Sequence, residues 1–133
     1  MARSITIDIL APVPSKKNGR ILTKGISLPS KAYMTWHKEM MLRIKGACEV
    51  FPLYRISVEF CMGDLVHRDQ DNSVTSILDL LQDAGITLND SWRYAPSGAW
   101  YTIYKKGVWH CKVTLTEQEQ YFDGGFTRFR DTQ

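Results

Sequence analysis

The segment between residues 64 and 90 restricts the fold more than any other part of the chain. Its apolar residues recur at a spacing that places them on one face of an α-helix: Val74, Ile77, Leu78, Leu81 and Ala84. Gly85 follows, and a glycine at this point is a common helix stop. The pattern predicts an amphipathic helix with its apolar face turned to the core.

Strand patterns occur on both sides of this helix. Residues 4–11, 54–62 and 108–116 alternate apolar with polar side chains, as half-buried strands do, and residues 99–104 form a shorter aromatic strand. Only residues 105–107 join the last two strands, so we expect these strands to form a hairpin.

The N-terminal part adds a second helix and a basic loop. Ser30 is a suitable N-cap, and helical spacing continues over residues 31–45. Residues 12–27 are rich in turn-forming residues and predict a loop or an irregular hairpin. The basic side chains on its exposed side suit phosphate contacts: Lys16, Lys17, Arg20 and Lys24.

These elements follow one another in the order β-α-β-α-β-β. That order predicts an α+β domain with a mixed four-stranded sheet and two helices packed against it. The chain of 133 residues is long enough for one such core, which we place in residues 1–116, with residues 117–133 as a C-terminal tail or arm.

Several protein classes are disfavoured by composition. No apolar run approaches the roughly 20 residues of a membrane span, and the N-terminus lacks the features of a secretory signal, so we expect a cytoplasmic protein that does not contact a membrane. The cysteines are odd in number and widely spaced, which favours free, buried thiols over disulfides or zinc: Cys48, Cys61 and Cys111. His37 and His110 lie in expected regular elements, where a structural role is the more common one.

Charge is segregated along the chain. Residues 1–47 carry nine Lys or Arg against two acids, whereas residues 64–90 carry six acids against a single Arg68. A basic half facing an acidic pocket is typical of a metal-dependent enzyme that acts on a polyanion, and an ordinary solvated surface is the alternative.

Three acids of the segment form a candidate metal site. Asp69 and Asp71 are two residues apart, so in an extended segment their side chains would point the same way. Asp90 can join them only if the chain after Gly85 doubles back along the helix. Carboxylates without thiol or imidazole partners favour Mg²⁺ or Mn²⁺ over zinc, and a helix cap with a second solvated acid is the alternative.

The order of these motifs resembles the RusA family of Holliday junction resolvases. The family's core reads D-x-D-N, then a helix with D-x-L, then G-x-x-x-D-D. This chain has matching residues in Asp69-Gln70-Asp71-Asn72, Asp79-Leu80-Leu81 and Gly85 to Asp90. Two N-terminal stretches are also similar: Pro14-Ser15-Lys16-Lys17-Asn18 and Pro29-Ser30-Lys31-Ala32-Tyr33.

The resemblance implies a RusA-like fold and a homodimeric endodeoxyribonuclease that resolves four-way DNA junctions by paired symmetric nicks in DNA recombination and repair. Mg²⁺, or alternatively Mn²⁺, would be its cofactor, with no small-molecule cofactor, and its place would be the cytoplasm, or the host cytoplasm if a virus or prophage encodes it. The implied catalytic and metal-binding residues are Asp69, Asp71 and Asp90. The expected DNA-binding residues are Lys16, Lys17, Asn18, Arg20, Lys24, Lys31 and Arg68.

The chain departs from the family pattern at two positions. Asn89 replaces the first acid of the D-D pair, and Thr75 replaces a lysine one turn into the helix. A threonine cannot stabilise charge on a scissile phosphate, so another cation is needed, with these candidates: Lys16, Lys17, Lys31 and Lys112. The alternative function is a non-catalytic protein that binds branched DNA. A D-x-D site for a nucleotide sugar is disfavoured, because no glycine-rich βαβ unit is present.

Overall fold

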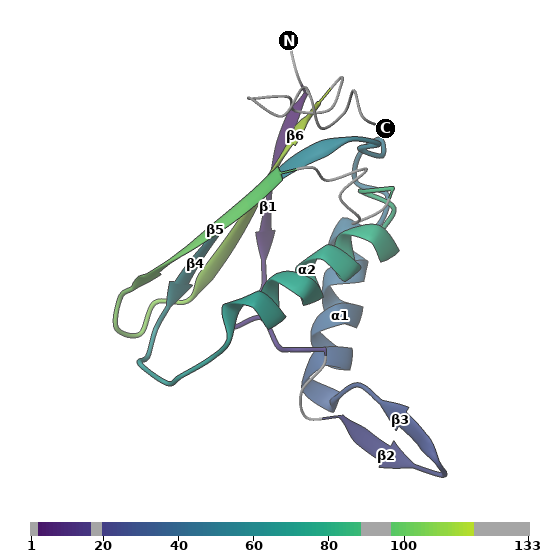
Figure 1. The fold of residues 1–133 in the computed structure, drawn as a ribbon, viewed down its shortest axis with the longest axis vertical. Helices are drawn as coiled ribbons and strands as arrows, with labels where there is room; N and C mark the ends of the chain where they lie inside the picture. The colour runs from purple at the N-terminus through teal and green to yellow at the C-terminus, as the bar shows by residue number, and fades with distance from the viewer. Residues whose placement is uncertain (1–2, 17–19, 89–96, 119–133) are drawn as a thin grey trace, which may run out of the picture.

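The fold is an α+β arrangement in which a mixed sheet carries its helices on one face (Figure 1). The computed structural model describes residues 3–16, 20–88 and 97–118. The sheet has four strands, in the spatial order β1 (Ser4–Ile9), β6 (His110–Glu117), β4 (Tyr54–Met62) and β5 (Ser97–Tyr104). The remaining elements are α1 (Lys31–Ile44), α2 (Gln70–Asp83) and a separate hairpin of β2 (Ile21–Thr23) and β3 (Ile26–Leu28). The predicted fold class, the four-stranded mixed sheet and the two helices are therefore confirmed.

The pairing of the last two strands differs from the expectation. β6 pairs antiparallel with both β1 and β4, and β5 pairs parallel with the other edge of β4. The predicted hairpin of adjacent strands is therefore wrong, because β4 lies between β5 and β6. The connection instead crosses the end of β4, where the Lys105 N–H donates to the Met62 carbonyl at 3.0 Å and the Gly107 N–H to the Gly63 carbonyl at 2.8 Å.

The inner face of the sheet forms the core with both helices. Alternate residues of β4 face the helices, and Tyr54, Val58 and Phe60 are almost completely buried. On the helical side the fully buried residues include Met40 of α1 and Leu80 of α2. Burying large apolar side chains on both layers is the main stabilising term for a fold of this kind.

The buried stripe of α2 is rotated from the predicted one. Ile77, Leu81 and Ala84 are buried as expected, but Val74 and Leu78 are only partly buried. The buried face instead includes Leu80 and two serines, Ser73 and Ser76. The reason is that these serines receive the loop after β1, so polar residues occupy part of the inner face.

The helix boundaries agree with their sequence signals. Ser30 caps α1, and its hydroxyl accepts a hydrogen bond from the Tyr33 N–H at 3.2 Å. Gly85 lies just beyond α2 with φ of +74°, a conformation that favours glycine. Within the described residues, no helix combines the length and apolar character that crossing a membrane requires.

The C-terminal boundary is slightly later than expected. β6 extends to Glu117, one residue into the segment predicted to be a tail. Residues 119–133, which make up most of the predicted tail, lie outside the described part of the chain.

The thiols provide a direct test of this fold. All three cysteines are free, as predicted, but only Cys61 and Cys111 are buried, while Cys48 is partly exposed. Burial, helped by the negative charge of Glu59, raises the pKa of the Cys111 thiol to about 12.

We expect Cys48 alone to react with an aromatic disulfide reagent at pH 8 in the native protein, and all three cysteines to react after denaturation. Rapid labelling of Cys111 in the native state, measured by peptide mass spectrometry, would contradict the inward orientation of β6.

Candidate functional site

The connection from β4 to α2 is fixed by one ion pair. The Asp64 carboxylate accepts a hydrogen bond from the Arg68 guanidinium at 2.6 Å and another from the Val66 N–H at 3.1 Å. This pairing lowers the pKa of Asp64 and raises that of Arg68. Arg68 also lies over the ring of Trp109 at 5.2 Å, and a Cβ atom at Gly63 would collide with the same indole. The end of β4 and the turn that contains Trp109, just before β6, together therefore set the position at which α2 begins.

Asp69 and Asp71 both lie at the N-terminus of α2. Asp69 occupies the N-cap position with extended backbone angles, yet its side chain makes no capping hydrogen bond, and Asp71 lies in the first helical turn. The helix begins between them at Gln70, so the geometry of an extended segment does not apply to the pair. Their common environment is the positive end of the helix dipole.

The other described acids of this segment have basic or histidine partners. The three pairs are Asp64 with Arg68 at 2.6 Å, Asp79 with Lys16 at 3.3 Å and Asp83 with His37 at 2.8 Å. Asp71 has no such partner among the described residues. Asp69 faces the exposed His67, whose Nε2 lies 3.9 Å from the carboxylate. Both acids proposed as metal ligands are thus without a Lys or Arg partner in the part of the chain that the structure describes.

The third proposed ligand, Asp90, lies outside the described residues. The chain reverses at Gly85, and the N–H groups of Ile86 and Thr87 both donate to the Leu81 carbonyl, at 2.9 and 3.3 Å. At Thr87 the chain is still level with Leu81, about 15 Å along the helix from Asp71 at 1.5 Å per residue. Three further residues span at most about 10 Å, so a shared site needs a nearly extended path toward Asp71 and the reach of both side chains.

The donor set is compatible with a hard cation but is incomplete within the described residues. Asp69 and Asp71 offer exposed carboxylate oxygens, which Mg²⁺ and Mn²⁺ prefer. No group of three or more His, Cys, Asp or Glu side chains comes together in residues 3–16, 20–88 and 97–118. The remaining ligands of a bound cation would therefore have to come from Asp90 or from solvent.

Thr75 stands at the position where the RusA family has a lysine, and its hydroxyl is already hydrogen-bonded. Thr75 donates from its Oγ1 to the Asp71 carbonyl at 3.0 Å, one turn earlier in α2. Lys16 is drawn toward Asp79, further along the helix, and Lys31 lies in the first turn of α1. Lys112 lies on the outer face of the sheet, away from the helices, since its neighbours Cys111 and Val113 point inward. Of the four candidate replacements, Lys112 is therefore excluded by the fold, and Lys17 lies outside the described residues.

The residues expected to contact DNA fall into two groups. Lys24 at the turn of the β2–β3 hairpin and Lys31 are exposed. Arg20, in contrast, donates to the Ser27 hydroxyl at 2.7 Å and to the Ser27 carbonyl at 2.8 Å, which holds the hairpin to the preceding loop. Lys16 and Arg68 are engaged in the ion pairs described above, while Lys17 and Asn18 lie outside the described part of the chain.

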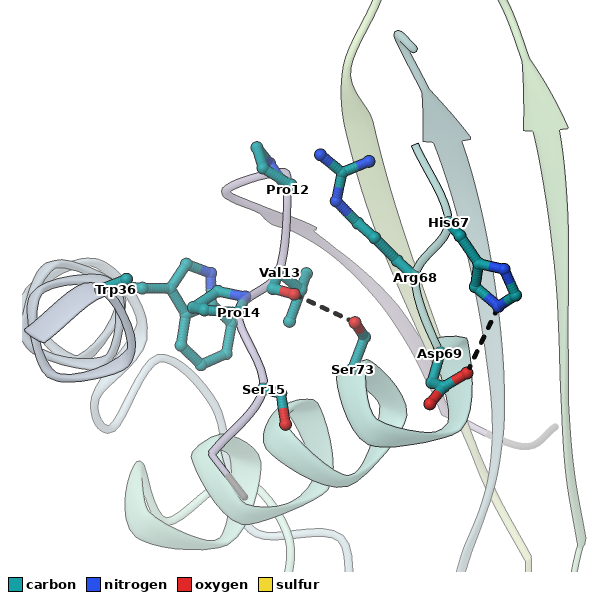
Figure 2. Close-up of a pocket in the computed structure, with 10 residues that line it drawn as sticks. Pro12, Val13, Pro14, Ser15, Trp36, His67, Arg68, Asp69 and Ser73 are labelled. Atoms are coloured by element: carbon teal, nitrogen blue, oxygen red, sulfur yellow. Dashed lines mark hydrogen bonds and ion pairs between the residues drawn. The ribbon is translucent and has the colours of Figure 1, made fainter. Parts of the chain in front are cut away.

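A cavity of about 540 Å³ lies beside the N-terminus of α2 (Figure 2). Its walls come from the loop after β1, from α1 and from the start of α2, and are formed by Pro12, Val13, Pro14, Ser15, Ala32, Trp36, His67, Arg68, Asp69 and Ser73. Figure 2 shows Ser73 pointing toward the Val13 carbonyl, and Asp69 pointing away from that contact toward His67. The sequence patterns identified Arg68 and Asp69 but not the proline and tryptophan walls, because nothing local indicates that these segments meet.

Two buried serines hold the loop against α2. The Ser73 hydroxyl donates to the Val13 carbonyl at 3.0 Å, and the Ser76 hydroxyl accepts from the Lys16 N–H at 3.0 Å. Each bond satisfies a loop backbone group that would otherwise be shielded from water without a partner. The basic loop is thereby fixed next to the two acids.

Removing the Ser73 hydroxyl should loosen this loop. We expect Ser73→Ala to lower the free energy of unfolding by about 1–2 kcal/mol, because the buried Val13 carbonyl loses its donor. Urea denaturation followed by circular dichroism measures the change. Thr75→Ala is the matched control in the same helix, since its hydroxyl bonds only to the preceding turn and the substitution should be close to neutral. Equal effects of the two substitutions would argue against the docking role of Ser73.

No model of a known protein family matches the chain, and no curated protein gives a significant match to it either.

Proposed function

We propose that the chain is a metal-dependent endonuclease that resolves four-way DNA junctions by paired nicks, acting in DNA recombination and repair. The supporting observation is that, among the described residues, Asp71 has no ion-pair partner and Asp69 has only the exposed His67 at 3.9 Å, whereas Asp64, Asp79 and Asp83 have partners at 2.6 to 3.3 Å. Two carboxylates at one helix end repel each other, and a divalent cation removes that cost. The same two positions match the acids of the resolvase motif.

In this proposal Asp69 and Asp71 hold Mg²⁺ or Mn²⁺, with Asp90 as a further ligand. Such an ion, when bound, polarises a phosphate and lowers the pKa of an attacking water. The contribution of the protein is to position these acids, because the pair of Asp64 and Arg68 fixes the start of α2.

The proposed path of the DNA backbone follows exposed cations in the N-terminal part of the chain. Lys24 projects at the hairpin turn and Lys31 at the start of α1, and both are free to approach phosphates. Arg68 lines the cavity beside Asp69, although its ion pair with Asp64 must be shared or exchanged when a phosphate binds.

One observation favours a second candidate function. Because Thr75 carries no charge and its hydroxyl is bonded to the Asp71 carbonyl, no cation is supplied at the position where the family has a lysine. A protein that binds branched DNA without cleaving it is consistent with this feature. It would bind junctions with a steep salt dependence and show no cleavage with any divalent metal.

The decisive experiment compares two acids of the same helix. Purified protein is incubated with Mg²⁺ or Mn²⁺ and a synthetic four-way junction, with a linear duplex of the same sequence as the substrate control. We expect junction nicking by the parent and a loss of more than about 100-fold in Asp71→Asn, because a metal ligand is weakened. Asp83→Asn, which removes a carboxylate paired with His37, should cleave like the parent.

Binding to the junction is measured in parallel by fluorescence anisotropy in EDTA. Asp71→Asn should bind at least as tightly as the parent, since it removes a negative charge near the DNA. Junction binding by the parent without nicking would favour the non-catalytic function. Undiminished nicking by Asp71→Asn would contradict the proposed metal site.

A further inference from the structure

The outer edge of the sheet at β5 has an unusual surface for a strand in contact with water. Its eight residues carry no charge, and four of its large side chains are about half exposed: Trp100 at 48%, Tyr101 at 51%, Ile103 at 45% and Tyr104 at 50%. The opposite edge, β1, places Ser4, Thr6 and Asp8 on its exposed side. Edge strands normally carry charges or prolines that prevent pairing, and β5 has neither.

The backbone of β5 is open along this outer edge. The strand pairs with β4 on its inner edge, and no other described strand pairs with it. Two of its side chains are held back from the outer edge: the Tyr101 hydroxyl donates to Glu59 on β4, and Thr102 accepts a hydrogen bond from Gln70 of α2 at 3.3 Å. Within the described residues, the N–H and C=O groups on this edge are therefore left without a partner strand.

We propose that β5 pairs antiparallel with β5 of a second copy of this chain, about a two-fold axis at Tyr101, to give a continuous eight-stranded sheet. An isologous contact of this kind must bring residues of the same sheet face opposite each other. With Tyr101 on the axis, Ala99 lies opposite Ile103 of the other copy, Gly98 opposite Tyr104 and Trp100 opposite Thr102. All seven residues from 98 to 104 then have a partner.

The side chains of β5 favour a second copy over an unrelated peptide. Gly98 and Ala99 are small whereas Ile103 and Tyr104 are large, so the antiparallel arrangement places these two large residues against the two small ones. In the same register Trp100 lies opposite Thr102, and Tyr101 lies opposite its own copy. The absence of charge in β5 means that two copies meet without repulsion.

A hollow on the outer face of the sheet supports the same register. It has a volume of about 300 Å³ and is lined by Arg55, Ile56, Ser57, Gly98, Ala99, Thr114 and Thr116. The hollow exists because short side chains meet there on three adjacent strands. Ile103 of the second copy, opposite Ala99, would lie at its rim and cover it. The strand thus carries both a large apolar residue and the space that receives it.

The dimer has a consequence for the candidate sites, and only this consequence rests on the proposed function. A two-fold axis perpendicular to the sheet keeps the helices of both copies on one face. The Gln70–Thr102 bond places the start of α2 above β5, one residue from the axis. Two copies of Asp69 and Asp71 would therefore lie on the same face of the dimer, related by the symmetry that paired nicks in a four-way junction require.

The oligomeric state tests the inference without DNA or metal. Light scattering after size exclusion should give the mass of two chains for the parent, and of one chain for Ile103→Lys, because a lysine on the edge disrupts the pairing and must be desolvated. Leu42→Lys is the control: Leu42 is 78% exposed on α1, so this variant should remain dimeric. A parent protein that is monomeric at micromolar concentrations overturns the inference.

A crosslink identifies the strand even if Ile103→Lys fails to fold. In a Cys48→Ser background, Tyr101→Cys should form an intermolecular disulfide on mild oxidation, since the two thiols face each other at the axis. Thr6→Cys on the other edge strand is the matched control and should not crosslink. A dimer that crosslinks through position 6 but not position 101, or that persists in folded Ile103→Lys, overturns the assignment to β5. The mass and the crosslink are independent of nicking, so this inference and the proposed function fail separately.

Discussion

The two-sided pairing of β4 is the interaction on which the rest of the structure depends. Its parallel edge holds β5 and its antiparallel edge holds β6, while its inner face contributes Tyr54, Val58 and Phe60 to the core. The strand also ends beside the turn that joins its two neighbours, where Gly63 accommodates Trp109. The same end leads into the pair of Asp64 and Arg68 and then into α2. The position of Asp69 and Asp71 is thus determined by where β4 stops.

Local sequence patterns were sufficient to predict the helices and strands but not to predict which strands pair. The ends of α1 and β4 follow from Ser30 and from strict alternation, because capping and pleat are properties of neighbouring residues. The hairpin between β5 and β6 was wrong because a short turn is also compatible with crossing a third strand, and only the distant β4 decides between these arrangements. The inner face of α2 was misplaced for a similar reason, since a serine such as Ser73 looks solvent-exposed until its partner, the Val13 carbonyl, is known.

The candidate site shows the same division between local and distant information. The motif containing Asp69 and Asp71 is visible in the sequence, and the pairing of Asp64 with Arg68 follows the i, i+4 rule. The partners of Asp79 and Asp83, however, are 63 and 46 positions away in the chain. Only the tertiary structure shows that these two acids have partners, which separates them from Asp69 and Asp71 within a group of similar carboxylates.

The place of β6 between β1 and β4 has a consequence for synthesis of the protein. Its pairing with β1 joins residues as far apart as Ser4 and Thr116, 112 positions along the chain. While the polypeptide is being made, β1 and one edge of β4 therefore have no partner until the last strand leaves the ribosome. The sheet closes late, as contacts of high sequence separation do. Until then the nascent chain presents open strand edges, which can pair with other chains.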